Sequence, residues 1–213
     1  AEYLPLCRAN LTREYTEDQP NRLSPSLSFQ AITVPHDSEP TFAFRFEFSG
    51  SSSNSCWSLG FASDVGHVTD ALIDGFSGLD VLAIEYNHDV ALQQASPRPQ
   101  FLIDRVLGDF GHLSNQQAAD ATAQIAANSG PNGLACLIQL HLSRQCNHPD
   151  LAVAAGKLAL QHHAPAARII TASQKDPTPT ILLDGNSGSG GSRPGPRRRQ
   201  VQPTLPGMDT PPS

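Results

Sequence analysis

Residues 79–85 read LDVLAIE, a nearly continuous apolar run that ends on a glutamate. Such a run is typical of a β-strand that is covered on both faces. Three further runs that we interpret as strands also end at, or within two residues of, a side chain able to bind metal or transfer a proton. They are residues 28–34 before His36, 57–63 before Asp64, and 134–140 before His141. Because a sheet holds such side chains rigidly while their polar atoms stay outside the core, the pattern predicts a hydrolytic metal centre.

The rest of the chain alternates further strands with helical segments. Residues 41–48 carry phenylalanine at every second position, so one face of this strand is expected to pack against another layer. The remaining predicted elements are a short helix over 68–76, one helical turn in an irregular arm over 97–111, helices over 116–128 and from Pro149 onward, and edge strands over 168–171 and 180–183. This order predicts an α/β fold, a layered β-sheet with flanking helices.

The length of 213 residues suits one domain with a substantial core and is short for two. We expect a poorly defined segment over 1–27, a single domain over 28–184 and a tail over 185–213. The Gly, Ser, Pro and Arg composition of that tail cannot bury enough apolar area to offset the entropy of ordering, so disorder is expected there.

Composition limits the classes of partner and compartment. A net charge of −6 argues against a broad basic surface for nucleic acid, although a bound dication would supply its own local positive charge for a phosphate substrate. The four cysteines form no CxxC pair and no disulfide-framework spacing, which favours a reducing, cytoplasmic location. No apolar stretch approaches the ~20 residues of a transmembrane helix, so no membrane partner is expected.

His36, Asp64 and His141 are the candidate metal ligands on residue type alone. They offer two imidazoles and one carboxylate, each from a different strand end, and metal-assisted hydrolysis needs such groups to converge with an open position for water. Only a folded sheet could bring them together, and a hydrogen-bonded loop role is the alternative for each histidine. For His67 and His88 a second role near the site and an ordinary loop role both stay open.

Five segments carry a resemblance to a known family in the order in which that family shows them. They are VPHDSEP (34–40), ASDVGHVT (62–69), IEYNHD (84–89), GDFGHLSN (108–115) and LHLS (140–143). In this order they resemble the metallo-β-lactamase superfamily, and within it the WalJ (YycJ) branch of exonuclease-like, phosphodiesterase-type members. The resemblance extends over roughly residues 28–184.

The resemblance implies a role for each of five residues. His36 would bind the first metal, Asp64 would bridge both metals, and His141 would bind the second. His112 resembles a histidine that donates a proton at the scissile phosphate, and Glu85 would orient it through a hydrogen bond. The implied cofactors are two divalent metal ions, with Zn, Mn or Fe suited to mixed His and Asp ligation, and the implied substrate is nucleic acid or another phosphodiester.

Two further residues are predicted to contact the substrate. Ser114, which is predicted to bind substrate, has with Gln117 the spacing of a capping box that fixes the backbone at the start of the helix after His112. Arg105 lies in the arm that leads to His112 and is predicted to meet a phosphate. A solvated arm charge is the alternative for Arg105.

The chain departs from the family at its main metal-binding signature, His-x-His-x-Asp-His. No histidine precedes His36, so the chain resembles the carboxyl-terminal half of an αββα metallo-β-lactamase sandwich. Each metal would retain two protein ligands, fewer than the three plus water that are usual. We therefore expect a partial sequence or a partner subunit that supplies the other half, and an inactive hydrolase in the chain alone.

Three functions remain open at this point. The first is a dinuclear-metal phosphodiesterase that acts on nucleic acid ends, as in a nuclease or exonuclease. The second is a non-catalytic interaction domain that folds against a partner through its phenylalanine-rich strand. The third keeps the fold and the metals but hydrolyses a small ester, thioester or lactam.

Overall fold

The computed structural model describes residues 14–17, 19–38, 40–50, 56–130 and 133–182. The tail predicted over 185–213 and residues 1–13 of the predicted first segment lie outside the described residues. The division into three regions therefore stays a prediction.

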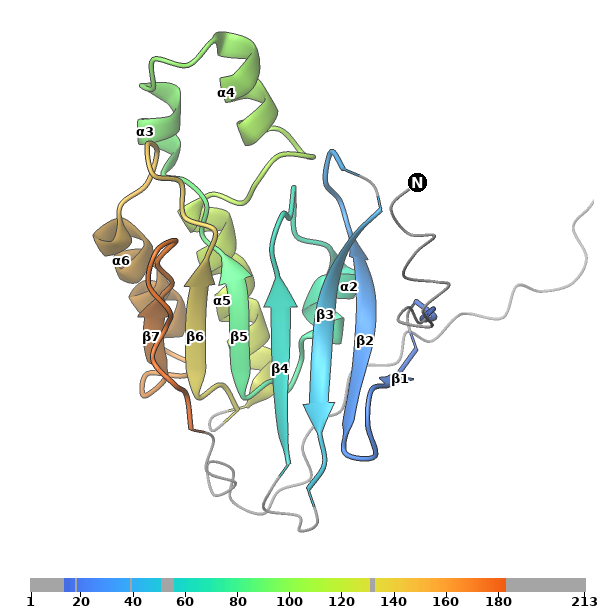
Figure 1. Cartoon of the computed structure of the whole chain (residues 1–213). Coiled ribbons are helices and arrows are strands. Elements are labelled where there is room, and N and C mark those ends of the chain that lie inside the picture. The colour runs from blue at the N-terminus through green and yellow to red at the C-terminus, as the bar shows by residue number, and fades with distance from the viewer. Residues whose placement is uncertain (1–13, 18, 39, 51–55, 131–132, 183–213) are drawn as a thin grey trace, which may run out of the picture.

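The described residues form one mixed sheet of seven strands that lie side by side in chain order (Figure 1). The strands are β1 (Asn21–Arg22), β2 (Leu27–Val34), β3 (Thr41–Phe48), β4 (Trp57–Ala62), β5 (Val81–Glu85), β6 (Cys136–Leu140) and β7 (Arg168–Thr171). Strands β1 to β4 pair antiparallel, whereas β4 to β7 pair parallel. Parallel neighbours need crossover connections, which the helices supply. The predicted α/β fold, a layered sheet with flanking helices, is confirmed.

The helices occupy two places relative to the sheet. Helices α2 (Asp70–Gly75), α5 (Asn115–Ser129) and α6 (Pro149–Leu160) lie behind the sheet in Figure 1, whereas α3 (Val90–Gln94) and α4 (Gln100–Leu107) stand beyond its upper edge. None of the described helices is long and apolar enough to cross a membrane.

Local chemistry explains where these helices start. Thr69 accepts a hydrogen bond from the Leu72 amide at the start of α2, and the predicted capping box of Ser114 and Gln117 opens α5. Pro149 occupies the first turn of α6, where its missing N–H is not needed.

The main core lies between the sheet and α2, α5 and α6. It consists of aliphatic side chains with few aromatics; Leu72, Leu82, Ile84, Ile125 and Leu137 are among its fully buried members. Strand β5 is buried along its whole length, as the LDVLAIE run predicted.

Strand β3 places its small and charged residues toward the helices and its phenylalanines on the opposite face. Ala43 and Arg45 are buried, and the Arg45 guanidinium donates to the main-chain oxygens of Gly75 and Ser77 at the end of α2. Phe44 and Phe46 are only half-buried. The alternation predicted for residues 41–48 is therefore present.

The structure differs from the sequence-based expectations in three segments. The arm over 97–111 contains the two-turn helix α4 instead of a single turn, and α3 is an additional short helix with Asp89 as its N-cap. Five residues are too few for a helical period to be recognised. Residues 180–182 are not a strand, and residue 183 lies outside the described part of the chain.

Candidate metal centre

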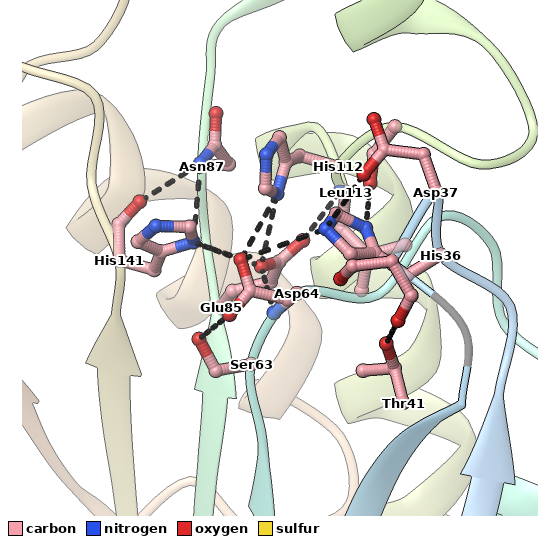
Figure 2. A network of polar contacts seen from close by, with 12 residues as sticks. His36, Asp37, Thr41, Ser63, Asp64, Glu85, Asn87, His112, Leu113 and His141 are labelled. Carbon is pink, nitrogen blue, oxygen red and sulfur yellow. Dashed lines mark hydrogen bonds and ion pairs between the residues drawn. The ribbon is translucent and has the colours of Figure 1, made fainter. Parts of the chain in front are cut away.

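The carboxyl ends of β4, β5 and β6 meet at one edge of the sheet because these strands are parallel. Asp64 and His141 follow β4 and β6, and Glu85 is the last residue of β5. Asp64 has a φ of 60° and His141 a φ of 56°, and no other described non-glycine residue has a positive φ. Left-handed backbone of this kind costs energy and concentrates at functional sites. Both residues thus turn sharply at the strand end, and Figure 2 shows their side chains converging.

Glu85 is the centre of the hydrogen-bond network at this edge and is fully buried. Its Oε2 accepts from the Asp64 amide at 2.7 Å, and its Oε1 accepts from the Leu113 amide at 2.7 Å. The same Oε2 lies 3.1 Å from Nδ1 of His141 and 3.5 Å from Nδ1 of His112 (Figure 2). One carboxylate therefore joins the loops after β4 and β6 to the segment before α5.

The pKa values of this network follow from those contacts. Burial by itself would raise the pKa of Glu85, but the adjacent His112 and His141 rings and the hydrogen bond from the Leu113 amide outweigh burial and lower its pKa to about 2. The hydrogen bond to Glu85 raises the pKa of His141 above its ordinary value, against the opposing effect of burial. Glu85 is therefore an anion at any pH at which the protein would function.

Three imidazoles surround Asp64. The contact of His36 Nδ1 with the Gly111 carbonyl, at 2.9 Å, leaves Nε2 directed toward Asp64, with Nε2 3.9 Å from Oδ1. The Oδ1 atom also lies 3.8 Å from Nδ1 of His112 and 3.6 Å from Nδ1 of His141. The ring of His112 lies between the other two, with centroid separations of 5.0 Å on either side.

The donor set suits a divalent cation. Asp64, Glu85, His112 and His141 each offer one ligand atom, and these four atoms lie within 4.8 Å of one another. Two imidazoles and two carboxylates are a common mixed ligand set for transition metals. A candidate metal-binding cluster is therefore present at the edge where the sequence predicts one.

The cluster and the predicted ligand set overlap in part. Asp64 and His141 belong to both, His36 stands beside the cluster, and Glu85 and His112 complete it. The structure thus brings all five predicted residues together at one edge, and which of them bind metal stays a prediction.

The two residues predicted to contact substrate lie near the cluster and differ in exposure. Ser114 is buried, and its hydroxyl both donates to Gln117 Oε1 and accepts from the Gln117 amide. Arg105 is exposed and forms an ion pair with Asp37. Its hydrogen bond lowers the pKa of Asp37, which also lies 3.3 Å from His36 Nε2. The arm is thereby fastened to the segment that carries His36.

Asn87 is a site residue that the sequence analysis did not single out. Its Nδ2 donates to the main-chain oxygen of His141 at 3.0 Å and lies 3.4 Å from that residue's Nδ1 (Figure 2). The amide of Asn147 donates to the main-chain oxygens of Tyr86 and Asn87 and so holds this segment in turn. The available signal in the sequence was the position of Asn87, whose amide side chain lies two residues after Glu85 at the end of a strand.

The two undecided histidines differ. Nδ1 of His67 lies 2.9 Å from the Asp109 carbonyl, as in an ordinary loop histidine. His88 is buried, and neither ring nitrogen has a hydrogen-bond partner among the described residues. Burial lowers the pKa of His88 to about 4, so its ring is neutral.

A cavity of about 190 Å³ opens next to the cluster. His112 and His141 line one part of it, and Asn87, Arg98 and Ser143 line others. A substrate in this cavity would therefore reach the two imidazoles that border Glu85.

Sequence comparison finds similarity to two curated exodeoxyribonucleases. Over 126 residues the chain is 26% identical to the exodeoxyribonuclease YycJ of Bacillus anthracis and 28% identical to the exodeoxyribonuclease WalJ of Streptococcus pneumoniae. The predicted resemblance is confirmed. The matches cover 59% of this chain but only 44% and 43% of the two relatives, so the chain spans less than half the length of each. No family model matches the chain.

The search of solved structures finds partial matches at low sequence identity. The metallo-β-lactamase fold protein YhfI of Bacillus subtilis has a TM-score of 0.49 and 15% identity, covering 77% of this chain and 56% of that one. A diphosphatase of the PhnP family has a TM-score of 0.45 and 14% identity, covering 79% of this chain and 49% of that one.

Proposed function

We propose that this chain carries part of the active site of a metal-dependent hydrolase that cleaves phosphodiester bonds in nucleic acid. The observation that carries the proposal is the convergence of polar side-chain atoms of Asp64, Glu85, His112 and His141 within 4.8 Å at a sheet edge, with His36 beside Asp64. The relatives YycJ and WalJ are exodeoxyribonucleases by name, which supports nucleic acid as the substrate class.

In the proposed site, His36, Asp64 and His141 would hold two divalent cations, for which Zn, Mn or Fe are suited, and Asp64 would serve as a shared ligand. Asp64 suits a shared ligand because its side chain is 45% exposed and lies within 4 Å of both imidazoles, 3.9 Å from His36 and 3.6 Å from His141. When bound, the cations supply Lewis acidity and activate a water for attack on phosphorus. Further ligands come from a segment or partner that completes the site, because three side chains are few for two ions.

Glu85 acts as a positioning residue in this proposal. Both of its oxygens already accept main-chain N–H groups, and its Oε2 faces Nδ1 of His112 and His141. A carboxylate in this place fixes the ring orientation of a ligand or an acid and sets which nitrogen carries the proton.

His112 is the proposed general acid. Its side chain is 22% exposed and lines the cavity next to the cluster, so a substrate oxygen can approach the ring while Glu85 restrains it. A positioned imidazole that gives its proton to the leaving alkoxide contributes about 10²–10⁴-fold in rate. Arg105 would bind the substrate after its ion pair with Asp37 breaks. Ser114 would contact the substrate beside His112 at the start of α5.

The experiment compares His112→Ala with His162→Ala, an exposed histidine beyond α6, in the natural full-length protein. Metal content by elemental analysis and cleavage of an end-labelled oligonucleotide are measured on each variant. We expect His112→Ala to retain its metal and lose about 10²–10⁴-fold in turnover, with His162→Ala unchanged. Full activity of His112→Ala removes that residue from the mechanism, and absence of metal-dependent cleavage in the wild type removes the proposed function.

The half-buried phenylalanine face of β3 favours a second candidate, a non-catalytic domain that folds against a partner. Phe61, opposite Phe44 on the neighbouring strand, is 39% exposed, and exposed aromatic patches often mark interfaces. This candidate predicts no metal at stoichiometric level. Elemental analysis of the purified protein therefore separates the two functions directly.

A further inference from the structure

A second and larger cavity, of about 390 Å³, adjoins the one next to the metal centre. The two cavities share Leu142, Ser143 and Gln174 in their linings. Because they border each other at these three residues, we treat the two cavities as one groove that begins at His112 and His141. The larger part lies where the chain leaves β6, enters α6 and leaves β7, between Pro149 and Thr171.

This groove carries positive charge in an acidic protein. Arg98 lines the first cavity, and Arg144 and Lys175 line the second, whereas no aspartate or glutamate lines either. The guanidinium of Arg98 donates to the neutral Gln145 amide oxygen at 3.0 and 2.9 Å, so its charge is not compensated by that contact. Arg144 and Lys175 are exposed and form no ion pair with any other residue in the described part of the chain.

Two carboxylates that are close in sequence to the groove lining make other contacts and form no ion pair with Arg144 or Lys175. Asp150 lies 3.3 Å from His148 at the start of α6, and Asp176 accepts a hydrogen bond from the Ser173 hydroxyl. On the opposite side of the metal centre, Arg105 is neutralised by Asp37. Among the described residues, the three cations that line the two cavities, Arg98, Arg144 and Lys175, thus have no ion-pair partner.

These features together fit a polyanion better than a small ester. A single small phosphodiester would fill only the 190 Å³ cavity, and nothing about such a substrate would use Arg144 or Lys175. A cavity of about 390 Å³ is within the range that holds a ligand of nucleotide size. Basic side chains beside hydroxyl and amide donors are the usual means of binding a sugar–phosphate backbone.

We propose that this groove binds the backbone of a single-stranded polynucleotide, with a phosphate adjacent to the reacting one held between Arg144 and Lys175. The inference rests on the proposed function, because it takes the first cavity as the place of the reacting phosphate. It specifies the substrate as a polymer and the direction in which the strand leaves the metal centre.

The test measures binding of a short fluorescein-labelled oligothymidylate to this chain by anisotropy, in EDTA and at several salt concentrations. Wild type is compared with Arg144→Gln/Lys175→Gln, with the charge-retaining Arg144→Lys/Lys175→Arg, and with Lys157→Gln as a control. Lys157 is exposed on α6 and lines neither cavity. All substituted side chains are exposed, and circular dichroism verifies that each variant folds.

Each phosphate contact contributes about 0.7 to the slope of log affinity against log salt for a single strand, so loss of two contacts lowers the slope by about 1.4. We expect roughly tenfold weaker binding at about 50 mM salt for Arg144→Gln/Lys175→Gln and wild-type behaviour for the other two variants. A wild-type chain that does not bind, equal slopes in all proteins, or an equal loss in Lys157→Gln overturns the proposal.

The binding test is independent of catalysis because it is carried out in EDTA. Strand binding that depends on Arg144 and Lys175, together with no metal-dependent cleavage by the full-length protein, would remove the proposed hydrolase and leave the strand path. Cleavage of an oligonucleotide together with unchanged salt slopes would do the reverse.

Discussion

The two faces of strand β3 are built from different kinds of residue. The face of the sheet toward α2, α5 and α6 carries aliphatic side chains that are almost completely buried, whereas the opposite face of β3 carries phenylalanines that are half-buried. Within β3, Ala43 is fully buried, and its larger neighbours Phe44 and Phe46 are not. Burial is therefore decided by which elements the chain supplies on each side and not by the hydrophobicity of the residue.

The largest expected difference between the faces is in packing energy. Leu82 lies fully buried in the core between sheet and helices, so Leu82→Ala should lower the free energy of unfolding by about 2–5 kcal/mol. Phe46→Ala, on the other face, should cost about 1–2 kcal/mol, because a half-buried ring loses less area from water. Urea unfolding midpoints at equal m-values measure both. Equal losses would show that the phenylalanine face is covered in solution.

The second expected difference is in acid stability, and it compares two glutamates. The folded pKa of Glu85 is about 2, against an ordinary value of 4.5, so its contribution is present above pH 4.5 and is lost as pH falls from 4.5 to 2. A shift of this size corresponds to stability on the order of 3 kcal/mol. Glu47, on β3, is exposed beside Arg45 and should contribute little.

Urea unfolding in EDTA as a function of pH measures this loss of stability at acid pH. Glu85→Gln should reduce the loss, and Glu47→Gln should leave it unchanged. The raised pKa of His141 acts in the other direction: its contribution is complete below its ordinary value of 6.5 and is lost as pH rises through the folded value. The lowered pKa of His88, about 4, removes stability as pH falls from 6.5 to 4, so we expect maximal stability in EDTA near pH 6.5. A maximum well above pH 7 would contradict the network around Glu85.

The third prediction concerns the same two glutamates at neutral pH. Glu85→Gln leaves one of the amides of Asp64 and Leu113 without an acceptor in a buried place, and should cost about 2 kcal/mol. The matched change Glu47→Gln keeps a side-chain oxygen that can accept from the buried Arg45 guanidinium, so it should cost less. Thermal unfolding of the two variants measures the difference, and an equal effect would mean that water reaches Glu85.

The smallest expected effect on stability is at the carboxyl end of β4, at the edge of the sheet. Asp64 has a φ of 60°, a backbone conformation that costs alanine more free energy than glycine. The hydrogen bond from the main-chain amide of residue 64 to Glu85 is kept in either substitution. Asp64→Gly should therefore be about 1 kcal/mol more stable than Asp64→Ala, with metal binding lost in both. Equal stability of the two variants, measured by urea unfolding in EDTA, would show that the backbone at Asp64 is not strained.

Some of the fold and much of the site could be predicted from local patterns. The bounds of β3 and of β7 agree with the predicted ranges, because two-residue alternation and short apolar runs report directly on strand burial. The capping box of Ser114 and Gln117 was also visible, because both partners lie within one turn. Helix α3 was missed, because a helix of this length has no period of its own.

The sequence by itself determined that chemically active side chains follow four strands, because the periodicity that marks a strand also marks its end. Only the tertiary structure decided what those side chains do to one another: that Glu85 accepts two distant amides, that Asp37 neutralises Arg105, and that Arg144 and Lys175 lie in one groove. The physical reason is that hydrogen bonding, charge compensation and cavities depend on distances across crossovers. Local sequence patterns contain no information on those distances.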